Sequence, residues 1–61
     1  MQLEISTEDR ATLLELVERA LSDTRVEIRR TSTPEFHDRL SAEAERLDDI
    51  LRRLRGLRPA A

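Results

Sequence analysis

The sequence predicts an all-α protein, an antiparallel two-helix hairpin with a short extended N-terminal segment, which dimerises into a four-helix bundle. Three observations lead to this prediction. Leucine, isoleucine and valine recur at alternating spacings of three and four residues in two long stretches, which is the spacing of an apolar stripe on a helix. One short break that contains Pro34 separates the two stretches. Each stripe is wider than one partner helix covers, so a homodimer is expected to complete the core.

The N-terminal segment alternates between apolar and polar residues, with Leu3 and Ile5 on one side and Gln2 and Glu4 on the other. Alternation is the pattern of an extended chain. A segment this short does not form a stable sheet alone. We therefore expect Met1–Ile5 to pack in an extended form against the open end of the bundle. Pairing with the same segment of a second copy is the alternative.

The first helix is expected over residues 8–30, which contain neither proline nor glycine. Ser6 supplies a hydroxyl that caps the first turn, and the acids Glu8 and Asp9 lie where they favour the helix dipole. The apolar stripe has a central seam that further apolar residues widen on its flanks. The seam is Leu14, Val17, Leu21, Thr24 and Ile28, and the flanking residues are Leu13, Leu16 and Ala20.

Residues 31–33 form the expected corner between the helices. Pro34 disfavours the helical conformation for the residue before it. A hydroxyl residue in extended backbone, followed by proline at the first helical position, is typical of a helix start. We therefore predict that Thr33 caps the second helix through its hydroxyl, rather than Ser32 in a capping box with Glu35. The short connection makes the helices antiparallel neighbours.

The second helix is expected over residues 34–55, with Gly56 at the C′ position that commonly ends helices and Pro59 preventing continuation. Its stripe consists of Phe36, Leu40, Leu47, Ile50, Leu51 and Leu54, with Ala44 on one edge. Four acid-first ion pairs are expected at a spacing of four residues. They are Glu15–Arg19, Glu35–Arg39, Asp48–Arg52 and Asp49–Arg53.

Folding the chain at the corner brings the two stripes together in layers. The expected layers include Val17 with Leu47 and Leu14 with Leu51. The same register places the acids at the start of the first helix beside the arginines at the end of the second. No linker interrupts this arrangement, so residues 1–61 are predicted to be one domain.

The composition offers little for catalysis. The chain has no cysteine, lysine, tyrosine or tryptophan and one glycine. It therefore lacks a thiolate metal site, a disulfide and a glycine-rich phosphate loop. His37 is the only histidine, and no good metal ligand lies three or four positions from it. We expect no enzymatic activity, no metal and no cofactor. No signal peptide or membrane span is recognisable, so the expected location is the cytoplasm.

The arginines are the residues that suggest a partner. The formal net charge is −2, which gives no overall attraction to nucleic acid or to anionic membranes. Arg25 and Arg29 are like charges one helical turn apart, an unfavourable spacing unless acids lie nearby. An acid from the chain, from a second copy or from another protein would relieve it. The predicted interaction surface consists of Arg25, Arg29, Arg52 and Arg55.

The leading functional prediction is a non-enzymatic structural or protein-interaction module that acts as a homodimer. A DNA-binding regulator or antitoxin is the alternative. The order of a short alternating segment and two helices superficially resembles the ribbon–helix–helix fold, in which paired strands read the major groove. Gln2 and Glu4 would face the DNA here, and an acid facing phosphates is unfavourable. The first helix is also longer than in that fold, and the loop glycine typical of it is missing.

A closer resemblance extends over nearly the whole chain. Its motifs are Leu3-x-Ile5-Ser6-x-Glu8-Asp9, then Leu21-Ser22-Asp23-Thr24-Arg25-x-Glu27-Ile28, then Thr31, Thr33, Phe36 and Leu40. This pattern is similar to a group of small uncharacterised bacterial proteins in which a short segment precedes two helices. The resemblance implies a helical hairpin and implies no particular activity. Ala20 departs from the group, whose members often have an aromatic residue there.

Overall fold

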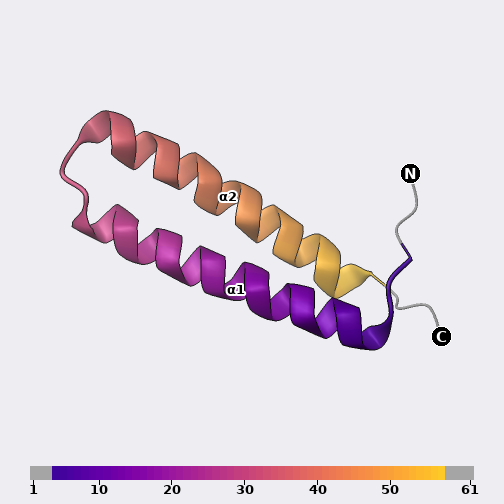
Figure 1. Ribbon diagram of the computed structural model, residues 1–61. Helices are drawn as coiled ribbons and strands as arrows, with labels where there is room; N and C mark the ends of the chain where they lie inside the picture. The colour runs from indigo at the N-terminus through magenta and orange to yellow at the C-terminus, as the bar shows by residue number, and fades with distance from the viewer. Residues whose placement is uncertain (1–3, 58–61) are drawn as a thin grey trace.

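The computed structural model describes residues 4–57. These residues form two helices, α1 (Thr7–Arg30) and α2 (Pro34–Gly56), which lie side by side and antiparallel (Figure 1). The connection at residues 31–33 forms one end of the molecule, and the start of α1 and the end of α2 form the open end. No strand occurs within residues 4–57. The predicted all-α hairpin is confirmed.

The N-terminal segment falls largely outside the described residues. Glu4 is exposed and Ile5 is partly buried, and neither belongs to a helix or a strand. The predicted packing of Leu3 and the ribbon–helix–helix alternative, which needs Gln2, both fall outside the described residues.

The start of α1 follows the predicted capping chemistry. Ser6 has extended backbone angles (φ −73°, ψ 166°), and its hydroxyl oxygen accepts a hydrogen bond from the backbone N–H of Asp9 at 3.0 Å. One of the free N–H groups of the first turn is thereby satisfied. At the other end, the N–H of Thr31 donates to the carbonyl oxygen of Glu27 at 2.9 Å. The helix begins one residue earlier than predicted.

The start of α2 is at the predicted residue but is capped differently. Thr33 is the N-cap in extended backbone and Pro34 is the first helical residue. The Thr33 hydroxyl, however, makes no capping hydrogen bond, so that part of the prediction is wrong. Its ψ angle is 116°, about 50° from that of Ser6, so the side chain is aimed differently. The first backbone bond of the helix is the same at both starts: the carbonyl of Thr33 accepts from the N–H of His37, and that of Ser6 accepts from the N–H of Arg10, each at 2.9 Å.

The end of α2 also differs from the prediction. Gly56 is the last helical residue rather than the C′ residue, and no residue within 4–57 has a positive φ. Leu57 follows in extended backbone, and its N–H donates to the carbonyl of Leu54 at 3.2 Å. A Cβ atom built on Gly56 would meet nothing within 4 Å. Neither the backbone conformation nor the packing requires glycine at this position.

The core is a single row of side chains between the helices. One buried residue is polar: the Thr24 hydroxyl donates to the carbonyl of Ala20 at 2.8 Å, which satisfies it. None of the buried side chains is completely enclosed. Of the predicted core and dimer residues, four are buried (Leu21, Leu40, Leu51 and Leu54), six are partly buried (Leu13, Leu14, Val17, Ala20, Ile28 and Leu47) and three are exposed (Leu16, Phe36 and Ile50).

The two helix starts predict different mutational costs. Ser6→Ala removes a capping hydrogen bond and should lower the free energy of unfolding by about 1 kcal/mol. Thr33→Ala removes a hydroxyl without such a bond and should cost less than about 0.5 kcal/mol. Urea unfolding of both variants at one protein concentration measures the difference. A loss at Thr33 equal to that at Ser6 would contradict the lack of a side-chain cap at Thr33.

Candidate functional site

The guanidinium of Arg10 joins the start of α1 to the end of α2. Its Nε donates to the carbonyl oxygen of Leu54 at 2.8 Å, and its Nη2 donates to the carbonyl oxygen of Arg55 at 2.8 Å. The last carbonyls of a helix lack intrahelical partners and carry partial negative charge, so a cationic donor compensates both properties. Within the described residues, no other hydrogen bond crosses between the helices. These two bonds from Arg10 therefore join the helices at the open end.

The sequence interpretation missed Arg10 and expected acids to serve this end. No ion pair joins Glu8 or Asp9 to an arginine of α2 in the described part of the chain. The missed signal was a spacing. Arg10 lies four residues before Leu14, at the position where an apolar residue would continue the seam. The predicted register, which pairs Leu14 with Leu51, then places Arg10 opposite Leu54, where it binds.

The surface ion pairs confirm part of the predicted set. Arg52 Nη2 lies 3.3 Å from Asp48 Oδ2, and Arg53 Nη2 lies 2.9 Å from Asp49 Oδ2. The other two expected pairs, Glu15–Arg19 and Glu35–Arg39, do not form within residues 4–57. Exposed pairs of this kind contribute little to stability, about 0–1 kcal/mol each.

Each helix has two flanks beside its buried row. Successive residues are about 100° apart around a helix, so residues that follow a core position and residues that precede one lie on opposite flanks. Ser22 and Arg25 follow the buried Leu21 and Thr24, whereas Ala20 precedes Leu21. The two flanks have different chemistry, and together they form the candidate functional surfaces.

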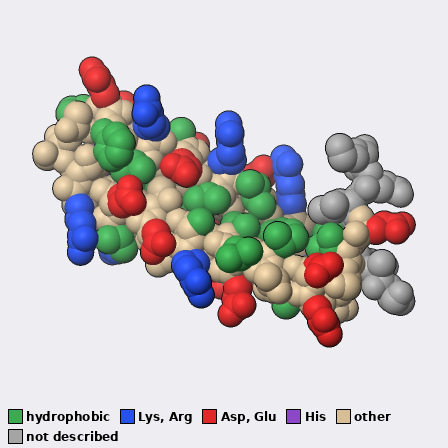
Figure 2. All heavy atoms as spheres, in the orientation of Figure 1, with side chains coloured by type: hydrophobic (Ala, Val, Ile, Leu, Met, Phe, Trp, Pro, Cys, Tyr) green, Lys and Arg blue, Asp and Glu red, His purple; other side chains and the backbone are tan. Residues whose placement is uncertain are grey.

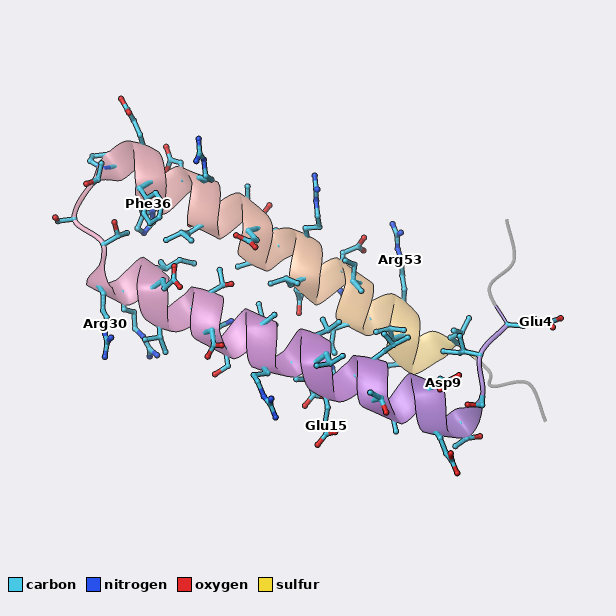
Figure 3. All side chains as sticks on the ribbon, viewed as in Figure 1. Glu4, Asp9, Glu15, Arg30, Phe36 and Arg53 are labelled. Carbon is cyan, nitrogen blue, oxygen red and sulfur yellow. The ribbon has the colours of Figure 1, made fainter. Side chains whose placement is uncertain are left out.

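The first surface, the apolar flank, carries large side chains that the hairpin leaves open. Leu16 is 54% exposed and Ile50 is 37% exposed. Figure 2 shows hydrophobic side chains gathered along the middle of this face, and Figure 3 places the 46%-exposed Phe36 on it near the corner. We define the apolar flank as Leu13, Leu16, Ala20 and Ile50.

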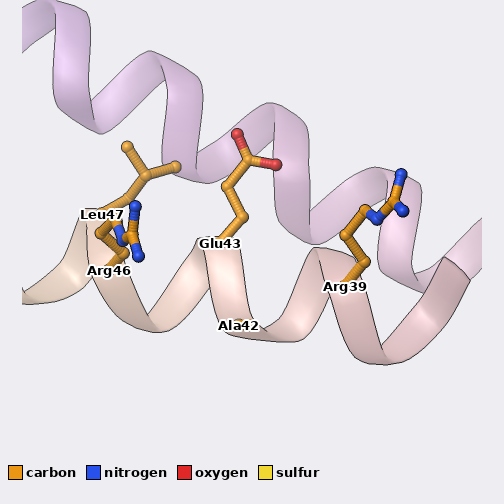
Figure 4. A pocket seen from close by; sticks show the side chains of 5 residues that line it. All are labelled: Arg39, Ala42, Glu43, Arg46 and Leu47. Atoms are coloured by element: carbon orange, nitrogen blue, oxygen red, sulfur yellow. The ribbon is translucent and has the colours of Figure 1, made fainter. Parts of the chain in front are cut away.

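Charged residues border the apolar flank: the edge of α1 carries acids, and the edge of α2 carries arginines with Glu43 among them. On α2, arginines repeat every seven residues and precede core positions, and Arg53 stands on the outer edge in Figure 3. On α1, the acids Asp23 and Glu27 precede core positions. A shallow hollow of about 390 Å³ lies along this side of α2, and Glu43 extends between two of the arginines (Figure 4). Its lining is Arg39, Ala42, Glu43, Arg46 and Leu47.

The second surface, the arginine groove, lies on the opposite flank and has a volume of about 290 Å³. Its floor includes Leu21 and Leu51, each 4% exposed. One interhelical ion pair crosses it, with Arg55 Nη2 3.7 Å from Glu18 Oε1. In antiparallel helices these side chains meet because each tilts toward the N-terminus of its own helix. The complete lining is Glu18, Leu21, Ser22, Arg25, Arg29, Leu51 and Arg55.

Three of the four predicted surface arginines are therefore brought together. Arg25 and Arg29 come from α1 and Arg55 from α2. Arg52 does not line the groove and instead pairs with Asp48 on its own helix. That these arginines form an interaction surface stays a prediction.

His37 lies outside both surfaces. Its Nδ1 is 3.9 Å from Asp38 Oδ1, and its side chain is half exposed. No group of three or more metal-ligating side chains occurs in the described residues. Neither α1 nor α2 has an apolar stretch of the length that crossing a bilayer requires.

Comparisons with known proteins found no match to this chain among family models, curated proteins or solved structures. The function is inferred from the two surfaces alone.

Arg10 has a testable contribution to stability. Arg10→Met keeps the length of the side chain but removes both hydrogen bonds, and it should lower the free energy of unfolding by about 1–2 kcal/mol. The bonds are exposed or only part-buried, which limits the loss. Arg19→Met, at an exposed arginine without an ion pair in the described chain, is the matched control and should change stability by less than about 0.5 kcal/mol. Equal losses in urea unfolding would show that the Arg10 contact is dispensable.

Proposed function

We propose that this protein is a small non-enzymatic interaction module that acts as a homodimer, with two hairpins packed through their apolar flanks into a four-helix bundle. The exposure of Leu16 and Ile50 carries the proposal, because the described chain has no further element that covers them. Each such side chain contributes about 1.5–3 kcal/mol when it is fully removed from water.

The size of the chain favours association. Below about 70–80 residues a single core rarely supplies more than about 3–5 kcal/mol, and small natural domains add disulfides, metals or partners. The chain has 61 residues and no cysteine, so a disulfide is excluded. Four buried apolar side chains form a thin core. No cluster of metal-ligating side chains occurs within residues 4–57, and a second copy is the stabilising partner that we propose.

The charged edges favour a second copy of this chain as the occupant of the apolar flank. A two-fold axis parallel to the helices places α1 of each copy against α2 of the other. The edge of α1 that carries Asp23 and Glu27 then faces the edge of α2 that carries Arg39 and Arg46. Acids of α1 then meet arginines of α2 at both edges, with Glu43 of α2 between those arginines, and the leucine and isoleucine side chains pack between the edges.

The shallow hollows support a non-enzymatic role. General acid–base catalysis needs groups that converge on a reacting atom. The hollow on α2 and the arginine groove are each lined by one carboxylate and by no histidine. A dimer of this kind acts by presenting its surfaces to other molecules.

The apolar flank gives a direct test by mass. The wild-type protein at micromolar concentration should have twice the 7.1 kDa mass of one chain in light scattering. Leu16→Glu buries a charge at the interface and should give a monomer. Ala11→Glu is the control, because it adds the same charge at an exposed position of α1 on the opposite flank and should stay dimeric. A monomeric wild type, or a dimeric Leu16→Glu variant, would contradict the proposal.

The orientation of the two copies has its own test. Arg39→Glu and Glu27→Arg each place like charges at the interface edge and should each raise the dissociation constant of the dimer roughly threefold to tenfold. The double variant exchanges the charges and should return the constant to within about twofold of wild type. Sedimentation equilibrium measures all four proteins. Additive losses in the double variant would show that these edges do not face each other.

A further inference from the structure

The arginine groove is the second surface that the hairpin leaves open, and it lies on the flank away from the proposed dimer contact. We propose that this groove binds an acidic segment of another protein, whose carboxylates pair with Arg25, Arg29 and Arg55. Each chain contains a complete groove, so this binding goes beyond the homodimer and does not depend on it.

The groove has positive charge at Arg25 and Arg29 that the described part of the chain does not pair. Arg25 and Arg29 are one turn apart on α1 and form no ion pair within residues 4–57, although Asp23 and Glu27 are close in sequence. Like charges at this spacing destabilise a helix by a few tenths of a kcal/mol. A bound anion reduces the repulsion between the two arginines, and both guanidinium groups attract the anion.

The third arginine extends the charge across the seam between the helices. Arg55 reaches over from α2 and touches Glu18 at 3.7 Å, which is a long ion pair. From the level of Glu18 to Arg29 the groove extends about 16 Å along α1, at about 1.5 Å per residue. A peptide segment with several carboxylates along its length fits this row better than one small anion, because donors to a small anion must converge on one point.

Carboxylates suit this groove better than a nucleic-acid backbone does. A guanidinium binds a carboxylate through two parallel hydrogen bonds, and glutamates one turn apart match the spacing of Arg25 and Arg29. Single-stranded nucleic acid also requires aromatic side chains for base stacking. The chain has one aromatic residue, Phe36, and it does not line the groove. Glu18 within the lining further opposes a continuous row of phosphates.

The probe for this proposal is a fluorescently labelled peptide of alternating glutamate and alanine blocks, about three helical turns long, with a glutamine peptide of the same design as its control. Fluorescence anisotropy should show binding of the glutamate peptide only, and the binding should weaken as salt rises. Arg25→Gln with Arg29→Gln should weaken binding at least about tenfold. The control pair Arg19→Gln with Arg30→Gln removes two exposed arginines of α1 outside the groove and should leave affinity within about twofold.

A gain of affinity makes the test sharper. Glu18→Gln frees Arg55 and removes a carboxylate from the groove, so it should strengthen peptide binding about twofold to fivefold. Absence of binding, equal losses in the control pair, or tighter binding of a DNA strand of matched charge that displaces the peptide would each overturn the proposal. The mass of the same samples reports the dimer separately, so failure of one proposal is distinguished from failure of the other.

Discussion

A hairpin of two helices encloses only the side chains that lie between them, and this constraint governs the whole molecule. Here it limits the buried apolar core to Leu21, Leu40, Leu51 and Leu54, none of them fully enclosed. With so thin a core, contacts at the open end become important, and Arg10 supplies two hydrogen bonds to the final carbonyls of α2. The remaining apolar side chains stay on one flank, where a second copy of the chain is their proposed cover.

The two flanks divide the surface by chemistry. The flank with Leu16 and Ile50 is apolar and bordered by opposite charges, which suits self-association. The other flank collects Arg25, Arg29 and Arg55 over a leucine floor, which suits an acidic partner. On each helix, residues that precede core positions lie on the first flank and residues that follow core positions lie on the second. Under the two proposals, one hairpin provides a dimer contact on one flank and a binding surface on the other, and neither covers the other.

Local signals were sufficient for the fold and insufficient for its long-range contacts. The Ser6 cap, Pro34 and the heptad-like spacing each act within a few residues, so the helices and the corner were predictable. Gly56 was misread because no residue within 4–57 has the positive φ of a C′ glycine. Arg10, which was missed, bonds the end of α2 from 44 residues away along the chain. Among the surface arginines, Arg52 failed to join the groove because Asp48 holds it on its own helix. An arginine can pair with an acid of its own helix or contact the other helix. The choice depends on its side-chain rotamer, which residue spacing alone does not define.

The central claim is that folding and self-association of this chain are linked. Thermal unfolding of the wild-type protein, followed by far-ultraviolet circular dichroism over about a hundredfold range of concentration, tests it most directly. The account predicts that the midpoint temperature rises steadily with protein concentration, because the dimer is favoured by mass action. A midpoint that stays constant across that range, in samples whose mass is that of a single chain, would contradict it.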